Sequence, residues 1–212
     1  MGQKKKMLKE KKRLKILAVG DIHGDTGLAK KLAERAEKEK VDLVIIAGDL
    51  TNFEKSTKNL LGHFEKKKKP VLVVHGNHES LATIDFLSEI YSGTTNLHGY
   101  SIEKGGTGIF GCGGADFGAS PMSEKDFFKT LKKAHEKIKD KKRKIMVTHM
   151  HPFKSKAEFS GFKGSNGIRR AIREFKPDIL LSGHIHEAEG IEEKIGKTKV
   201  INVGRKGRII EI

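Results

Sequence analysis

The run Val74-His75-Gly76-Asn77-His78-Glu79 guides the interpretation of the whole chain. Four apolar residues, 71–74, lead into it, and its glycine is followed at once by an amide and an imidazole. Glycine allows a sharp turn, and the oxygen of Asn and the ring nitrogens of His can bind metal ions. The run therefore predicts a buried strand whose end forms the floor of a metal site.

Four further runs have the same form, an apolar segment followed directly by polar residues that can bind metals. They end in Asp21-Ile22-His23, Gly48-Asp49, Thr148-His149 and Gly183-His184-Ile185-His186. Ligand sites in α/β folds lie beyond the carboxyl ends of strands. We therefore expect five strand ends to deliver their side chains to one place.

Helical signals separate these runs, in the form of apolar residues at helical spacing or of capping residues. Five helices are predicted. The first ends near Lys40, the second covers 55–68, and the third follows Ser80 and turns Leu81, Ile84, Leu87 and Ile90 inward. The fourth runs from Ser123 to about Lys139, and the fifth spans 168–175 after a cap at Asn166. Short β-rich pieces within 94–112 predict antiparallel strands and hairpins. Residues 150–165 are expected to form a long loop, and alternating strands should follow at 188–195, 197–203 and 207–212.

Strand-helix units thus fill the first half of the chain, and antiparallel strands join them later. This order favours an α/β sandwich of two sheets covered by helices over a single parallel sheet. The length of 212 residues, without a repeat or a linker, predicts one domain over residues 14–212. Residues 1–13 are Lys-rich and are expected to form a basic N-terminal extension.

The formal net charge of +16 admits an anionic substrate or nucleic acid as a partner. The first fifteen residues contain eight Lys and Arg against Glu10 alone, so the extension accounts for only part of the charge. Lys and Glu are both abundant, which also suits the surface of a heat-adapted soluble protein. Nucleic acid is therefore a partner that the charge allows but does not indicate, and the oligomeric state is open.

Cys112 is the single cysteine, so no disulfide framework is expected and a reducing cytoplasm is the simplest setting. Gly-Cys-Gly-Gly offers no neighbouring base, which favours a small buried side chain over a catalytic thiol. No apolar run approaches the length of about 18 residues that spans a membrane. We expect no association with membranes.

The polar strand ends supply an all-nitrogen and oxygen donor set of seven residues: Asp21, His23, Asp49, Asn77, His149, His184 and His186. A carboxylate can offer one oxygen to each of two cations, so Asp49 is the expected bridge. One metal would take Asp21, His23, Asp49 and His186. The other would take Asp49, Asn77, His149 and His184.

Two divalent ions about 3.5–4 Å apart can hold a hydroxide between them and clamp both oxygens of a phosphoryl transfer. The balance of His against carboxylate, without thiolates, suits Mn, Fe, Zn or Co better than Mg or Ca. The donor set therefore predicts a dinuclear metal site that acts on a small phosphoester.

In order along the chain, the blocks Asp-x-His, Gly-Asp, Gly-Asn-His-Glu, a lone His after a strand and Gly-His-x-His resemble the calcineurin-like metallophosphoesterase superfamily. All five blocks are present, and the resemblance runs from about Lys15 to Gly204. Gly-Asp-Leu-Thr-Asn, Gly-His-Ile-His-Glu and Asn-Val-Gly are similar to the predicted Icc-related phosphoesterases of archaea.

The resemblance implies a four-layer αββα sandwich of two mixed β-sheets flanked by helices. It also implies that His78 is not a ligand but faces the substrate, where it protonates the leaving oxygen or stabilises the transition state. The expected activity is hydrolysis of phosphate mono- or diesters by a metal-bridging hydroxide. The alternatives are a nuclease acting on DNA or RNA, and a non-catalytic scaffold of the same fold.

Five other histidines lie outside the donor set. His63, His75, His98 and His135 are expected to be structural, because they lie at a strand end or among charged and turn residues. His151 lies two residues from His149, so contact with substrate and a structural role are both open for it.

Overall fold

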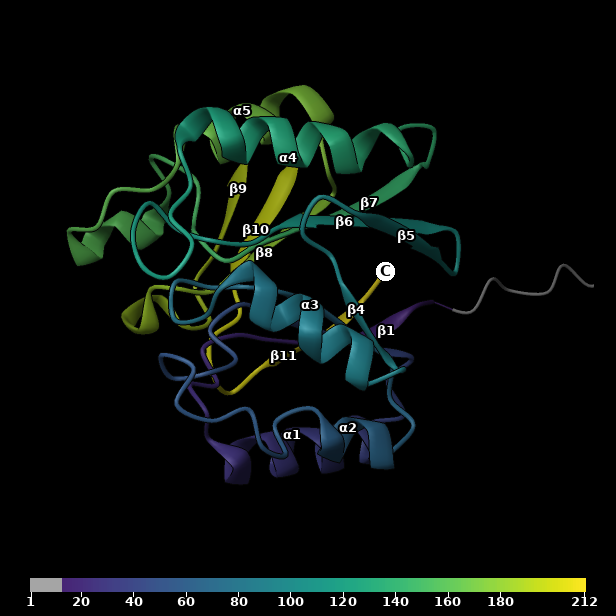
Figure 1. The fold of residues 1–212 in the computed structure, drawn as a ribbon. Coiled ribbons are helices and arrows are strands. Elements are labelled where there is room, and N and C mark those ends of the chain that lie inside the picture. Colours follow the sequence, from purple (N-terminus) through teal and green to yellow (C-terminus); the bar gives the residue numbers. More distant parts are fainter. Residues whose placement is uncertain (1–12) are drawn as a thin grey trace, which may run out of the picture.

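Two β-sheets stack face to face, and helices cover both outer faces (Figure 1). The structure is a computed structural model that describes residues 13–212, so nearly all of the predicted N-terminal extension lies outside the described residues. In Figure 1, helices α4 and α5 lie above the second sheet, whereas α1 and α2 lie below the first. The predicted αββα sandwich is confirmed.

The first sheet has five strands in the order β11-β1-β2-β3-β4. Their bounds are β1 Lys15–Val19, β2 Leu43–Ala47, β3 Val71–Val74, β4 Thr94–Asn96 and β11 Arg208–Glu211. Strands β1 to β4 run parallel, and only β11 is antiparallel to its neighbour β1. The ends of β1, β2 and β3 therefore meet at one edge of this sheet.

The second sheet has six strands in the order β5-β6-β7-β8-β10-β9. Their bounds are β5 Ser101–Lys104, β6 Thr107–Cys112, β7 Arg143–Thr148, β8 Ile179–Ser182, β9 Glu192–Ile195 and β10 Thr198–Asn202. Strands β6, β7, β8 and β10 are parallel, and the outer strands β5 and β9 are antiparallel. Each sheet is mixed.

The helices are α1 Thr26–Lys38, α2 Gly62–Lys66, α3 Leu81–Ile90, α4 Glu124–Glu136 and α5 Asn166–Phe175, with 3-10 turns η1 Lys156–Ser160 and η2 His186–Ala188. Successive side chains of a strand point to opposite faces of its sheet, so each strand contributes to two parts of the core. In β1, Leu17 and Val19 face α1, α2 and α3, whereas Ile16 and Ala18 face the second sheet. Among the described helices, none is long and apolar enough to cross a membrane.

The predicted helix over 55–68 is wrong for most of its length, because only α2 is helical there. Asn59 lies inside this range and has a positive φ angle of 58°, which a helix does not accommodate. Leu60 and Leu61 are fully buried, so the apolar residues of this segment hold a loop against the core.

Three smaller expectations are also wrong. β4 is parallel to β3 rather than part of a hairpin, because α3 returns the chain to the same edge before β4 begins. Only Ile84 and Leu87 of α3 are buried, and Ile90 is exposed. Ser165, not Asn166, caps α5, since its Oγ accepts the Ile168 N–H at 3.2 Å.

Candidate metal centre

The five polar turns converge where the carboxyl ends of the two sheets meet. β1, β2 and β3 deliver Asp21, His23, Asp49 and Asn77, whereas β7 and β8 deliver His149, His184 and His186. At Gly76 an added Cβ would overlap Asp49 Oδ1, and at Gly48 it would overlap the ring of His149. These two glycines let the turns approach closely enough for the side chains to gather.

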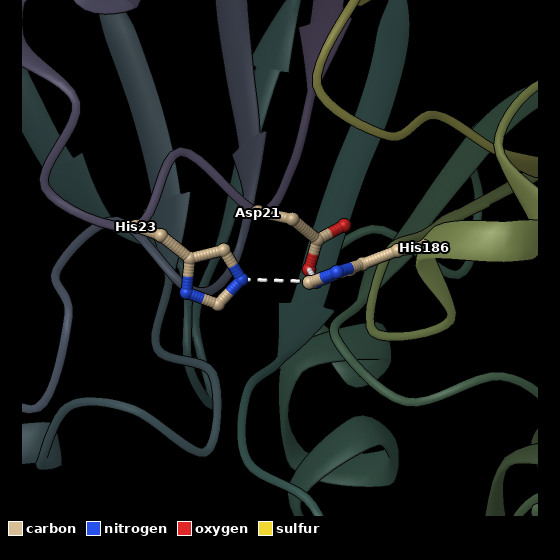
Figure 2. A group of neighbouring side chains, drawn as sticks. All are labelled: Asp21, His23 and His186. Atoms are coloured by element: carbon tan, nitrogen blue, oxygen red, sulfur yellow. Dashed lines mark hydrogen bonds and ion pairs between the residues drawn. The ribbon is translucent and has the colours of Figure 1, made fainter.

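The first group of donors contains Asp21, His23 and His186, which point toward one another (Figure 2). The Nε2 atoms of His23 and His186 lie 2.9 Å apart. His186 Nε2 lies 3.8 Å from Asp21 Oδ1, and His23 Nε2 lies 3.6 Å from Asp49 Oδ2. The group is thus continuous with Asp49.

The second group contains Asn77, His149 and His184. Asn77 Oδ1 lies 2.9 Å from both His149 Nε2 and His184 Nδ1, and these two nitrogens are 3.2 Å apart. His149 Nε2 is also 3.5 Å from Asp49 Oδ1. One carboxylate oxygen of Asp49 therefore faces each group, which is the arrangement expected of a bridge.

Backbone contacts fix the orientation of these side chains. His149 Nδ1 donates to the carbonyl of Ala47 at 2.9 Å, which leaves Nε2 with a free lone pair. The N–H of His184 donates to Asp21 Oδ1, and the N–H of His78 donates to Asp49 Oδ1, both at 3.0 Å. The donors are therefore held in place by the fold itself.

Four of the seven donors have left-handed backbones, with φ angles of 56° at Asp21, 51° at His23, 51° at Asp49 and 73° at His184. Non-glycine residues seldom adopt this conformation, and it persists only where the surrounding structure imposes it. Such strain is concentrated at functional sites in many proteins. Here it directs polar side chains inward from the strand ends.

Burial shifts the pKa values of four of the donors away from their ordinary range. It lowers the pKa of His149 and His184 to about 3 and that of His23 to about 4. Burial, followed by the nearby Asp49 charge, raises the pKa of Asp21 to about 8. A neutral imidazole is the form that coordinates a metal.

The donor set fits divalent cations. With Nδ1 bonded to Ala47, His149 Nε2 and Asn77 Oδ1 face each other as two acceptors, and a cation would relieve this repulsion. Asp21 Oδ2 is buried without a hydrogen-bond partner among residues 13–212. Buried polar atoms of this kind need a partner, and an ion would supply one.

Glu79 is a residue to which the sequence analysis gave no role. It is fully buried and accepts the N–H groups of Gly76 at 2.8 Å, Thr51 at 3.0 Å and Leu50 at 3.2 Å. These bonds tie the turn after β2 to the turn after β3. Its position two residues after Asn77 was the only available signal, since the bonds are tertiary.

His78 lies at the wall of a cavity of about 250 Å³ that opens onto the donors. Its Nε2 lies 3.8 Å from Asp49 Oδ2, and its ring centroid lies 4.4 Å from that of His23. The side chain is 20% exposed, more than that of His23 at 13% or Asp49 at 3%. The structure brings His78 beside the donors, and its role as an acid rather than a ligand stays a prediction.

His75, His98, His135 and His151 have structural contacts. His75 Nε2 lies 3.1 Å from His98 Nδ1, and the ring of His135 stacks on Phe175 at 4.6 Å. His151 is buried, and its Nε2 donates to the carbonyl of Phe162 at 3.2 Å. That bond holds the loop after β7, so the structural reading of His151 gains support.

Comparison with known proteins finds one matching family and many solved structures with a similar fold. The model of the family described as calcineurin-like phosphoesterase matches residues 14–188. No curated protein matches the sequence.

Several solved structures resemble the fold. The structure of TT1561 from Thermus thermophilus has a TM-score of 0.73 at 19% identity, over 94% of this chain and 99% of that one. A dimetal phosphatase from Danio rerio has a TM-score of 0.64 at 12% identity, over 91% and 88% of the two chains. A structure described as a novel archaeal phosphodiesterase has a TM-score of 0.54 at 17% identity, over 93% and 99%. At these identities the likeness concerns the fold alone.

Proposed function

Because the chain belongs to the calcineurin-like phosphoesterase family, we propose that it is a dinuclear metal-dependent hydrolase of phosphate mono- or diesters. The position of Asp49 carries this proposal. Its Oδ2 lies 3.6 Å from His23 and its Oδ1 lies 3.5 Å from His149, so the two donor groups meet at one carboxylate. Two cations sharing Asp49 would account for both contacts.

In the proposed site, one ion would be held by Asp21, His23, Asp49 and His186, and the other by Asp49, Asn77, His149 and His184. When bound, such ions would activate water for attack and stabilise negative charge on the phosphoryl oxygens. Nitrogen and oxygen donors without thiolates favour Mn, Fe, Zn or Co.

The protein's own part in the reaction falls to His78 and the cavity. His78 stands at the cavity wall, where its Nε2 would hold a proton and deliver it to the departing ester oxygen. The centroid of the Phe53 ring lies 3.9 Å from that of the His78 ring. Glu79 would keep the turns that carry Asp49 and Asn77 in register.

A metal-reconstitution experiment tests the proposal. Chelator-treated protein would receive Mn, Fe, Zn or Co and then p-nitrophenyl phosphate, bis-p-nitrophenyl phosphate, or 2′,3′- and 3′,5′-cyclic nucleotides. We expect no turnover without metal, and recovery as bound metal approaches about two ions per chain. Turnover that ignores the chelator, or protein that binds no metal, would contradict the proposal.

The two alternatives are separated by the same protein preparation. A nuclease would degrade labelled single- or double-stranded DNA or RNA when loaded with metal, and the His78→Ala variant would not. A scaffold would bind no metal and hydrolyse none of the esters. We also propose a cytoplasmic setting, since a chain whose single cysteine is Cys112 has no disulfide framework.

A further inference from the structure

Two exposed phenylalanines line the cavity of the candidate metal centre, and a third lies beside it. In the described part of the chain the exposed large apolar side chains are Phe53, Phe86, Ile90, Tyr100, Phe117, Phe159 and Phe162. Phe117 and Phe162 line the cavity with Asp49, Asn77 and His78, and Phe53 lies against His78. Apolar side chains exposed together around a polar cavity mark a binding surface.

The fold holds these rings at the mouth from separate loops. Phe117 follows β6, and its ring lies 5.6 Å from that of His184. Its neighbour Gly118 packs onto the backbone of Asn77, and the N–H of Ala119 donates to Asn77 O at 3.0 Å. The loop that carries Phe117 is therefore fastened to the floor of the site.

Phe162 approaches from the loop between β7 and α5. Its carbonyl accepts the His151 Nε2–H at 3.2 Å, and its N–H donates to Ser160 Oγ at 3.4 Å. The side chain is 58% exposed while the backbone is held. Phe162 thus lines the cavity with an exposed ring on a held backbone, and so does Phe117, which is 49% exposed.

We propose that Phe117 and Phe162 bind a flat aromatic group of the substrate, so that the enzyme acts on phosphoesters of nucleosides. This inference rests on the proposed phosphoesterase function. Aromatic rings bind nucleobases by stacking, with little dependence on base identity. Glu187 and His186 share the cavity lining, so polar groups accompany the rings. A nucleobase has both a π-face and polar edges, whereas an acyl chain would leave these polar groups without partners.

The first test compares two diesters with the same leaving group, thymidine 5′-(p-nitrophenyl phosphate) and methyl p-nitrophenyl phosphate. They differ only in the group that is retained. We expect the metal-loaded protein to have a KM about tenfold or more lower for the thymidine ester, the effect of about one stacked base. In the double variant Phe117→Ala/Phe162→Ala the ratio of the two KM values should fall toward one.

Phe159→Ala and Phe86→Ala are matched controls, because these rings are 63% and 56% exposed but do not line the cavity. They should keep the wild-type ratio. Phe117→Leu separates stacking from simple apolar contact, and we expect it to lose most of the preference that Phe117 provides. An equal KM for both esters in the wild type, or a ratio unchanged in the double variant, would overturn the inference.

A binding measurement keeps this test separate from catalysis. Isothermal titration calorimetry would compare adenosine 5′-monophosphate with ribose 5-phosphate, which share the phosphate and the sugar but not the base. The nucleotide should bind about tenfold or more tightly, and the double variant should lose this difference. If adenosine 5′-monophosphate and ribose 5-phosphate bind equally while both esters are hydrolysed, the aromatic binding site is contradicted but the phosphoesterase function is not. Absence of hydrolysis of either ester contradicts the phosphoesterase function instead.

Discussion

The floor and the rim of the candidate site are built in different ways. The floor donors Asp21, Asp49 and His149 are at most 2% exposed and are held by backbone hydrogen bonds at the ends of parallel strands. The rim residues Phe117 and Phe162 are about half exposed and come from loops. The floor is therefore suited to a reaction that all substrates share, and the rim to the choice among them.

The largest expected effect comes from Asp49, because its Oδ2 faces His23 of the first group and its Oδ1 faces His149 of the second. Asp49→Asn replaces one carboxylate oxygen by an amide that cannot ligate through nitrogen. Bound metal should fall from about two ions toward one or none, and turnover should fall to background for every ester. Metal analysis and steady-state kinetics on the purified variant measure both quantities.

His23→Ala is the control for this prediction, since His23 belongs to the first group only. It should weaken one site and leave the second largely occupied. If Asp49→Asn binds as much metal as the wild type, Asp49 does not bridge two ions. The separation of a shared floor from a selective rim would then be ruled out as well.

His78 stands between floor and rim, and its removal is expected to have the next largest effect. A positioned general acid contributes about 10²–10⁴-fold, chiefly when the leaving group must be protonated. His78→Ala should keep both metals, lose activity severely on an alkyl or nucleoside ester, and lose much less on a p-nitrophenyl ester.

The outcomes for His78 are distinct. Equal losses on both kinds of ester, with metal retained, would mean that His78 stabilises charge on the phosphoryl group. Loss of metal would place His78 in the floor as a ligand, which its 3.8 Å distance to Asp49 Oδ2 allows.

Glu79 connects the turns that carry the floor donors Asp49 and Asn77. Its replacement should lower the stability of the fold more than the rate of hydrolysis. In Glu79→Gln the amide nitrogen would face either the N–H of Thr51 or that of Gly76, so a buried donor would lose its acceptor. Such a loss costs about 1–3 kcal/mol of the free energy of unfolding. Denaturant unfolding of the metal-free protein would measure it.

Glu65→Gln is a matched control, because Glu65 is an exposed residue of α2 far in sequence from the donors. Its free energy of unfolding should stay within about 0.5 kcal/mol of the wild type. If Glu79→Gln is as stable as this control, the bonds from Glu79 do not hold the two turns together.

The sequence predicted the floor because each part of it is local. Four apolar residues followed by Gly-Asn-His form a strand and its terminal turn, and parallel pairing brings such turns together. The same locality explains the errors. Residues 55–68 were predicted to be helical, but the left-handed backbone of Asn59 interrupts the segment before α2. Asn59 is not a glycine, so the sequence gives no sign of this conformation.

Contacts between segments that are distant in sequence could not be predicted from local sequence patterns. The parallel pairing of β4 depends on how α3 crosses the sheet, and the role of Glu79 depends on two turns that are 26 residues apart between Leu50 and Gly76. The rim was also missed, because local sequence does not distinguish a phenylalanine that lines a cavity, as Phe162 does, from an exposed one that does not, such as Phe159.

The smallest expected effect concerns residues 1–12, which lie outside the described chain. All floor donors begin at Asp21 and all rim residues lie beyond it, so neither region needs the Lys-rich extension for chemistry. Deleting residues 1–12 should leave turnover of bis-p-nitrophenyl phosphate nearly unchanged, with the same metal content and the same unfolding midpoint. Steady-state kinetics at two salt concentrations would check this, because clustered Lys residues can attract an anionic substrate at low ionic strength. A loss of more than about tenfold at both salt concentrations, with the fold intact, would show that the extension contributes to the floor or the rim, since simple charge attraction weakens as salt rises.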